Sequence, residues 1–127
     1  MKTHEFISML QALADAWTRR DYGRAASFFS ENVQYADPLR YRLASRDQLL
    51  AFFSADDGQP QTTHWHNILF DEAHQIGAAE YSYTGTHTYH GVTMIRIESN
   101  QITQWREYQH TTVRPWPDFA GATSFEM

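Results

Sequence analysis

The sequence predicts an α+β fold in which helices cover one face of a curved, mostly antiparallel sheet. Three observations carry this prediction. The chain of 127 residues is long enough for one hydrophobic core and too short for two. Apolar residues recur at helical spacing as far as Phe53, and β-rich runs follow from Thr62 onward. We therefore expect a single domain over residues 1–127, with its core over about residues 3–112 and a C-terminal tail over 113–127.

A first helix is expected over about residues 3–19, because one stripe of apolar side chains recurs there at helical spacing. Its members are Phe6, Leu10, Leu13 and Trp17. Asp21 then offers the N-cap of a short second helix. That second helix is expected to include Phe28 and Phe29.

The stretch VQYADPL, residues 33–39, predicts a short strand that ends in an acid. Alternation along the strand places Val33, Tyr35 and Asp37 on one face. Pro38 ends the strand, because it cannot donate a hydrogen bond to a neighbouring strand. Asp37 therefore shares a face with core residues.

A third helix follows, since Ser45 and Gln48 have the spacing of a capping box and Gly58 lies near the expected end. Phe53 belongs to this helix. Four β-rich runs come next, at residues 62–70, 76–86, 90–98 and 101–112. Residues 98–101, between the last two runs, favour a hairpin turn.

Composition excludes several classes of partner. The formal net charge is −5, and the ten basic residues form no stripe, so no nucleic acid is expected. Zero cysteines exclude disulfides and thiolate catalysis and are compatible with a reducing compartment. No run reaches the length of a membrane span, and the N-terminus lacks the apolar core of a signal peptide. We expect a cytoplasmic protein with no membrane partner.

Two motifs carry a resemblance to a known family. They are FFSENVQYADP, residues 28–38, and IRIESNQITQWREYQ, residues 95–109. Together with the order of elements over about residues 3–112, they resemble the nuclear transport factor 2-like superfamily, and within it the SnoaL-like polyketide cyclases and ketosteroid isomerases. The resemblance implies a cone of about three helices on a strongly curved sheet, with a pocket between them. It also implies a homodimer formed through the outer face of the sheet.

The resemblance to ketosteroid isomerases implies a role for Asp37, because the matching aspartate in those enzymes is the base that moves a proton next to a carbonyl. Those enzymes also hold the enolate with a tyrosine and a protonated acid. The corresponding positions here are Leu13 and Thr93, and Leu13 cannot donate a hydrogen bond. Losing an oxyanion donor costs about 3–4 kcal/mol of transition-state stabilisation. Steroid isomerisation by that mechanism is therefore not expected.

The run WREY, residues 105–108, resembles the last strand of the limonene epoxide hydrolase group, with Glu107 in place of an aspartate. In that group the carboxylate activates a water, and an arginine and a second aspartate on an earlier strand protonate the epoxide. The corresponding stretch here, residues 80–83, reads EYSY and lacks both. Strand alternation puts Trp105, Glu107 and Gln109 on one face, which the resemblance directs toward the pocket.

Asp37 and Glu107 are the predicted catalytic pair. Two carboxylates in an apolar pocket have their pKa values separated by desolvation and repulsion, so one acts as acid and the other as base near neutral pH. The alternative for Asp37 is a turn residue that bonds its own backbone before Pro38. The alternative for Glu107 is an acid at the sheet edge paired with Arg96 or Arg106.

Histidine supplies a third candidate. His66 is predicted as a proton shuttle beside Asp37, since an unperturbed histidine has a pKa of about 6.5. His64 lies two residues away on the same strand, so the pair has the form of a metal-binding motif when a carboxylate joins it. That spacing alone is a weak signal, and we expect neither a metal nor a cofactor.

The predicted enzyme performs cofactor-independent acid–base chemistry of the isomerase, cyclase, dehydratase or hydrolase type on a small apolar or cyclic molecule. Four Trp, seven Tyr and eight Phe suit an aromatic-lined cavity. The predicted ligand-binding residues are Tyr35, Trp105, Tyr83, Leu13, Trp17 and Phe53. The alternative is a non-catalytic member of the same fold that binds a ligand in the pocket or a protein on its sheet. Metal-dependent chemistry on the histidines is a third reading.

Overall fold

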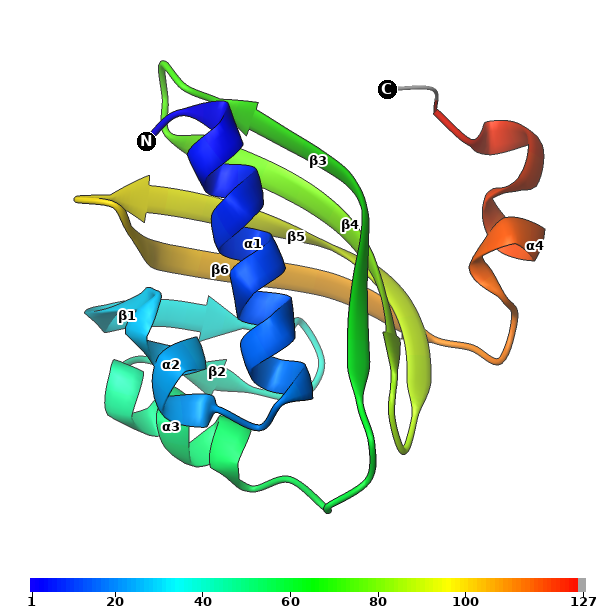
Figure 1. Ribbon diagram of the computed structural model, residues 1–127, viewed down its shortest axis with the longest axis horizontal. Helices are drawn as coiled ribbons and strands as arrows, with labels where there is room; N and C mark the ends of the chain where they lie inside the picture. Colours follow the sequence, from blue (N-terminus) through cyan, green and yellow to red (C-terminus); the bar gives the residue numbers. More distant parts are fainter. Residues whose placement is uncertain (126–127) are drawn as a thin grey trace.

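The computed structural model describes residues 1–125 and shows the predicted α+β class (Figure 1). Three helices come first in the described chain, and two short helical segments end it. They are α1 (Thr3–Thr18), α2 (Tyr22–Ser27), α3 (Arg46–Ser54), α4 (Trp116–Ala120) and a 3-10 turn at Gly121–Thr123. Helices α1 to α3 lie together on one side of the sheet, whereas α4 lies away from these three helices, at the other end of the sheet.

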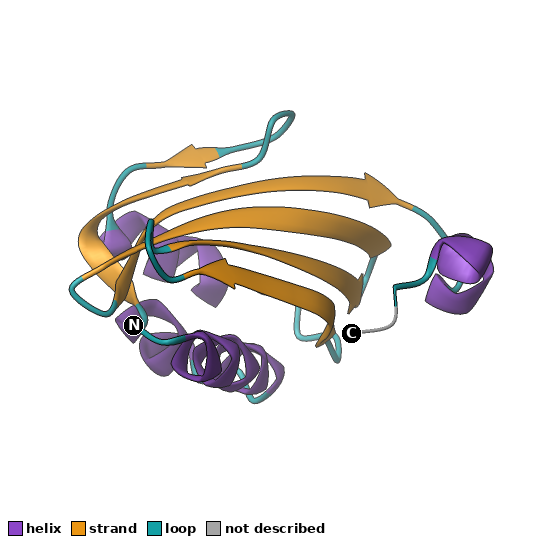
Figure 2. Cartoon of the chain, turned by 90° about the horizontal axis from the view of Figure 1, so that it is seen from above, coloured by secondary structure: helices purple, strands orange, loops and turns teal. Residues whose placement is uncertain are grey.

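Six strands within residues 1–125 form one sheet, in the order β2-β1-β6-β5-β4-β3. Their bounds are β1 (Phe29–Ala36), β2 (Arg42–Leu43), β3 (Thr62–Asp71), β4 (Ile76–Thr84), β5 (Thr88–Glu98) and β6 (Gln101–Thr111). All neighbours are antiparallel except β1 and β6, which are parallel. The long strands bend together, and the three N-terminal helices cover the concave face (Figure 2).

Local sequence signals set several of the boundaries as predicted. Asp21 caps α2 by accepting from the backbone N–H of Arg24 at 3.2 Å. Ser45 caps α3 by accepting from the backbone N–H of Gln48 at 3.1 Å. The turn between β5 and β6 places Ser99 and Asn100 at φ of 51° and 60°. Two successive residues of positive φ suit the right-handed twist of a tight hairpin, which fixes the register of β6 against β5.

The second helix is shorter than predicted. It ends at Ser27, and Phe29 begins β1, where it pairs with Ile102 of β6. Phe28 is the C-cap of the helix, and Phe29 buries its ring in the core as the first residue of the strand. Strand β2 was not predicted, because two residues carry no periodic signal.

The core lies between α1 and the concave face of the sheet. Phe6, Leu10 and Leu13 of α1 are fully buried, and they belong to one cluster with Phe29 and Trp105. Each such side chain contributes about 1.5–3 kcal/mol when it leaves water. None of the helices in the described part of the chain is long and apolar enough to cross a membrane.

Candidate active site

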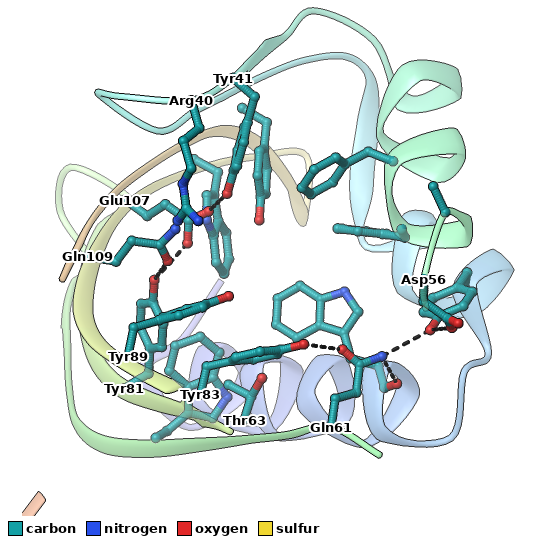
Figure 3. A pocket seen from close by; sticks show the side chains of 18 residues that line it. Arg40, Tyr41, Asp56, Gln61, Thr63, Tyr81, Tyr83, Tyr89, Glu107 and Gln109 are labelled. Atoms are coloured by element: carbon teal, nitrogen blue, oxygen red, sulfur yellow. Dashed lines mark hydrogen bonds between the residues drawn. The ribbon is translucent and has the colours of Figure 1, made fainter. Parts of the chain in front are cut away.

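A cavity of about 370 Å³ opens between the helices and the concave face of the sheet (Figure 3). Its lining is mostly aromatic, with a few polar groups. The aromatic members are Trp17, Tyr22, Tyr35, Tyr41, Phe52, Phe53, Trp65, Tyr81, Tyr83, Tyr89 and Trp105; the polar members are Arg40, Asp56, Gln61, Thr63, Glu107 and Gln109. Such a cavity, with few polar groups among many rings, is the usual form of a small-molecule site.

Most of the side chains predicted to bind a ligand lie on this lining, and their contact with a ligand stays a prediction. These are Tyr35, Trp105, Tyr83, Trp17 and Phe53. Leu13 does not line the cavity. Its side chain is fully buried in the core cluster, one helical turn before Trp17 on the same stripe of α1. The stripe therefore reaches the cavity only at its C-terminal end.

Glu107 is the buried acid of the cavity. Strand alternation on β6 turns Trp105, Glu107 and Gln109 inward together, as predicted. Only 5% of the Glu107 surface is exposed. Its two carboxyl oxygens are held by two hydroxyls, Oε1 by Tyr41 and Oε2 by Tyr81 at 2.8 Å. Sequence reasoning missed both tyrosines as site residues, since Tyr41 comes from a loop and Tyr81 from a distant strand.

Burial raises the pKa of Glu107 above its usual value of 4.5, because an ionised carboxylate loses its hydration there. The hydroxyls of Tyr41 and Tyr81 act in the opposite direction, with smaller effects from Tyr35 and Trp105. The indole N–H of Trp105 does not reach hydrogen-bond geometry with Glu107. Burial, with the charge of Glu107, in turn raises the pKa of Tyr41 and Tyr81. The cavity thus favours neutral groups.

Two tryptophans of the cavity have unused donors. The indole N–H groups of Trp17 and Trp105 are buried and make no hydrogen bond within residues 1–125. Their rings meet edge to face, with centroids 6.0 Å apart. A buried donor without a partner costs about 1–3 kcal/mol.

Asp37 is buried but does not line the cavity. Its Oδ1 accepts from the backbone N–H groups of Leu39 at 2.7 Å and Arg40 at 2.8 Å. Its Oδ2 accepts from the Arg40 guanidinium at 3.2 Å and from Gln109 Nε2 at 2.9 Å. These contacts support the turn role that the sequence left open. The role of base stays a prediction that this geometry does not favour, since both carboxyl oxygens already have two donors each.

His66 lies away from the cavity, which corrects its expected place beside Asp37. On β3 the alternation turns Trp65 inward and His66 outward. There the ring of His66 stacks on Trp116 with centroids 3.7 Å apart, and its Nε2 is 2.7 Å from Ser82 Oγ. The predicted proton shuttle is therefore absent from this side of the sheet. The sequence of the strand did not fix its facing.

The histidine pair does not form a metal centre. The rings of His64 and His66 are neighbours, with centroids 4.9 Å apart. No group of three or more His, Cys, Asp or Glu side chains in the described chain is placed to hold a metal ion.

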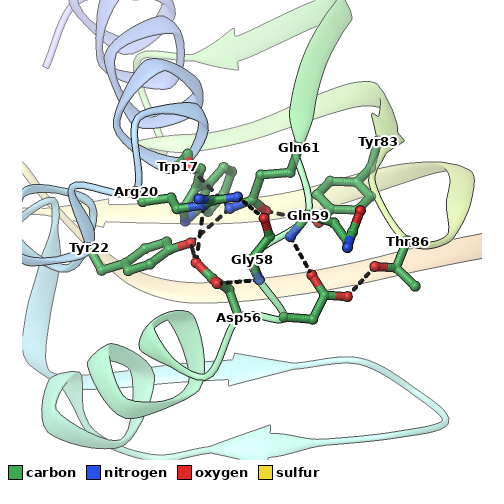
Figure 4. Close-up of polar contacts among 10 residues, drawn as sticks. Trp17, Arg20, Tyr22, Asp56, Gly58, Gln59, Gln61, Tyr83 and Thr86 are labelled. Carbon is green, nitrogen blue, oxygen red and sulfur yellow. Dashed lines mark hydrogen bonds and ion pairs between the residues drawn. The ribbon is translucent and has the colours of Figure 1, made fainter.

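One side of the cavity is lined by a network centred on Gln61 (Figure 4). Gln61 Nε2 donates to the backbone carbonyl of Trp17 at 3.0 Å and to the hydroxyl of Tyr22 at 2.9 Å. Its Oε1 accepts from Tyr83 at 2.8 Å, and Tyr22 donates to Asp56. This network connects the end of α1, the loop before β3 and strand β4 on this side of the cavity.

Comparison with known proteins identifies the family of the chain. The family model described as a SnoaL-like domain matches residues 10–105, more than half of the chain. The chain belongs to the SnoaL-like domain family. This SnoaL-like chain has no match among curated proteins.

Solved structures share the fold at low sequence identity. An LEH-like epoxide hydrolase from M. tuberculosis superposes with a TM-score of 0.75 and 16% identity over 85% of this chain and 84% of its own. A ketosteroid isomerase-like protein from Kribbella flavida gives 0.74 and 16% over 98% and 91%. A polyketide cyclase-like protein from Xanthomonas campestris pv. campestris gives 0.70 and 16% over 83% and 90%. At these identities the likeness shows the SnoaL-like, nuclear transport factor 2-like fold.

Proposed function

We propose that this SnoaL-like protein is a cofactor-independent acid–base enzyme that uses Glu107 on a small, uncharged, cyclic molecule. The observation that carries the proposal is the buried Glu107 carboxyl on an aromatic-lined cavity, held by the hydroxyls of Tyr41 and Tyr81. A carboxyl whose pKa is raised by burial keeps its proton closer to neutral pH, where it can act as a general acid.

The chemistry needs only this one carboxyl. A neutral Glu107 delivers a proton to an oxygen of the substrate, and the carboxylate that results takes a proton from a carbon of the substrate or from water. The group returns to its starting state. Dehydration, keto–enol isomerisation and ring opening of an epoxide all follow this order of proton transfers. Neighbours described as an epoxide hydrolase and as isomerase-like and cyclase-like proteins have the same fold, which is compatible with this range.

The lining supports an uncharged substrate with an oxygen that accepts hydrogen bonds. Arg40 is the cation on the lining, and it is already paired with Asp37 at 3.2 Å. An anionic ligand would therefore compete with Asp37 for its counter-ion. A carbonyl, ether or epoxide oxygen of the substrate would accept the proton of Glu107, which lies on the lining. The surrounding rings favour a flat or cyclic carbon skeleton.

The test is a panel of uncharged cyclic epoxides, enones and β-hydroxy ketones. Binding is measured by the rise in melting temperature, and turnover by mass spectrometry of the products. We expect at least one class to be converted by the wild type, and conversion to fall by about 100-fold or more in Glu107→Gln. The matched control is Glu98→Gln, which changes an exposed carboxyl at the end of β5 and should leave turnover unchanged.

Two outcomes would contradict the proposal. Equal conversion by the wild type and by Glu107→Gln would show that Glu107 is not the general acid. Tight binding without conversion of any class would favour the alternative, a ligand-binding member of the family without catalysis.

A further inference from the structure

The orientation of the Gln109 amide is set by Asp37. Gln109 Nε2 lies 2.9 Å from Asp37 Oδ2. The Asp37 carboxyl already accepts from the backbone N–H groups of Leu39 and Arg40 and from the Arg40 guanidinium. A carboxyl surrounded by donors in this way acts as an acceptor. The amide nitrogen of Gln109 must therefore face Asp37, and its carbonyl oxygen must face the other way.

The carbonyl oxygen of Gln109 in turn accepts the single hydroxyl hydrogen of Tyr81. The Tyr81 hydroxyl lies 2.7 Å from Gln109 Oε1 and 2.8 Å from Glu107 Oε2. Gln109 Oε1 has no hydrogen to give, so Tyr81 must donate in that contact. A hydroxyl has one hydrogen only. The contact between Tyr81 and Glu107 then lacks a hydrogen unless Glu107 supplies it.

We infer that Asp37 is a positioning residue that, through Gln109 and Tyr81, orders these hydrogen bonds so that Glu107 Oε2 carries a proton. The chain of donation runs from Glu107 Oε2 to Tyr81, from Tyr81 to Gln109 Oε1, and from Gln109 Nε2 to Asp37. Glu107 Oε1 stays an acceptor for Tyr41. An ionised Glu107 would need the hydrogen of Tyr81 for itself, which would leave two bare oxygens, those of Tyr81 and Gln109, 2.7 Å apart.

Gly91 makes room for this chain of hydrogen bonds. It lies opposite Tyr81 on β4 and opposite Gln109 on β6, so both of its cross-strand partners take part in these hydrogen bonds. A Cβ atom at Gly91 would lie 2.9 Å from Cζ and from the hydroxyl oxygen of Tyr81. Any side chain at this position would push the Tyr81 hydroxyl out of place. A glycine is therefore needed here because the Tyr81 ring approaches the backbone closely, and not because the chain turns.

The inference deepens the proposed function and rests on it for its purpose, because a proton held on Glu107 is what general acid catalysis requires. Its test needs no substrate. The groups that face Glu107 are the hydroxyls of Tyr35 on β1, Tyr41 in the loop before β2, Tyr81 on β4 and Tyr89 on β5, with Asp37 and Arg40 as the charges beyond them. Tyrosines stay neutral across the range in which Glu107 is titrated.

The experiment follows the carboxyl carbon of Glu107 by ¹³C NMR from pH 4 to pH 9, with the signal assigned by its loss in Glu107→Gln. We expect the wild type to show a protonated carboxyl at pH 7. In Asp37→Asn the new amide can donate to Gln109, which lets Gln109 turn over and frees the Tyr81 hydrogen for Glu107. The midpoint of the Glu107 titration should then move to lower pH.

A second variant guards against a folding defect in Asp37→Asn. Gln109→Leu removes the acceptor of the Tyr81 hydrogen and leaves the turn contacts of Asp37 in place, and it should move the midpoint in the same direction. The matched control is Asp71→Asn. Asp71 accepts from two backbone N–H groups in a similar turn, at 3.0 and 3.3 Å, but is exposed and far from the cavity. Its substitution should leave the midpoint unchanged.

An ionised Glu107 at pH 7 in the wild type would overturn the inference. So would equal midpoints in the wild type, Asp37→Asn and Gln109→Leu. A protonated Glu107 in a protein that converts no substrate would instead overturn the proposed function and leave the hydrogen-bond order standing.

Discussion

Asp37 and Glu107 are both buried carboxyls, with 7% and 5% of their surfaces exposed, but their partners differ in kind. Asp37 is held by two backbone N–H groups, a guanidinium and an amide N–H, all of which can only donate to it. Glu107 is held by hydroxyls, which can donate to it or accept from it. The structure therefore separates two acids that looked like a pair in the sequence.

At the residue scale, Glu107→Gln is expected to raise the melting temperature at pH 7. A carboxyl whose pKa is raised in the folded state stabilises the fold fully below its unfolded pKa, here 4.5, and loses that contribution as pH rises through the folded value. The amide keeps the neutral form at every pH. A gain of about 1–2 kcal/mol corresponds to roughly 3–10 °C for a domain of this size.

The measurement is a pair of melting curves, at pH 7 and at pH 4. The gain from Glu107→Gln should shrink at pH 4, where the wild-type carboxyl is neutral in both states. A gain of the same size at both values would show that packing and not ionisation is responsible. Glu98→Gln is the matched control.

Asp37→Asn is expected to act in the opposite direction. The amide can still cap the backbone N–H groups of Leu39 and Arg40, but its nitrogen cannot accept from the Arg40 guanidinium. We expect a loss of about 1–3 kcal/mol in the free energy of unfolding, measured by urea denaturation at pH 7. A variant more stable than the wild type would mean that Asp37 is kept at a cost to stability, and the catalytic role predicted from its sequence match would regain support.

At the scale of elements, one glutamine joins the loop between α3 and β3 to three other elements. Gln61 makes side-chain hydrogen bonds to α1, α2 and β4. Gln61→Ala should release the loop, so amide hydrogen exchange over residues 55–61 is expected to speed up by about 10-fold or more. Gln59→Ala, in the same loop but with an exposed side chain, is the control. Equal protection in both variants would show that the other contacts of the loop, at Asp56, Asp57 and Gly58, hold it without Gln61.

Helix α4 is attached to the outer face of the sheet by a second set of contacts. Trp116 stacks on His66, and Ser82 Oγ lies 2.8 Å from His90 Nδ1. His90 Nε2 is 2.7 Å from the backbone carbonyl of Arg114, to which it must donate. His90 Nδ1 is then an acceptor, so Ser82 donates to it and accepts from His66. In this order His66 donates through Nε2, as it can in both its neutral and its protonated form.

Acid is expected to loosen α4, because the surroundings of His66 disfavour its protonated form. Burial, with His64 and His90 nearby, lowers the pKa of His66 from 6.5 to about 4. The detached state takes up the proton first, so attachment weakens as pH falls from 6.5 toward 4. Because the ring is partly exposed, solvent screens the effect, and a gradual change is expected.

The change can be followed by ¹⁹F NMR of 5-fluorotryptophan at position 116. The wild-type signal should move toward that of an exposed indole over this pH range. His66→Phe keeps a ring for stacking and removes the titration, so its signal should move less. Identical pH profiles in the two proteins would exclude His66 as the cause.

At the scale of the whole molecule, the homodimer through the outer face of the sheet stays a prediction. Two large apolar side chains, Leu69 on β3 and Tyr108 on β6, are 58% and 46% exposed. We expect sedimentation velocity to give the mass of a dimer, and Tyr108→Glu to shift it toward the monomer, because a charge at a buried contact is strongly unfavourable. A wild-type monomer at micromolar concentration would contradict the prediction.

Local patterns in the sequence were enough to predict most of the elements. Helical spacing indicated α1, side-chain caps at Asp21 and Ser45 began α2 and α3, and alternation placed Glu107 on the same face as Trp105. These features depend on neighbours within a few residues, which the sequence displays directly. The family match followed from the same local patterns.

Which acid faces the cavity, and which groups bind it, depends on contacts between residues that are far apart in the sequence. Glu107 meets Tyr41 across 66 residues and Tyr81 across 26, and Gln109 meets Asp37 across 72. The curvature of the sheet brings these side chains together, while the facing of β3 sends His66 to the opposite side. The direction of each hydrogen bond depends on which donors and acceptors surround it. Those neighbours come together only when the strands pair, so the sequence could indicate the two carboxyls as candidates but could not show which of them carries a proton.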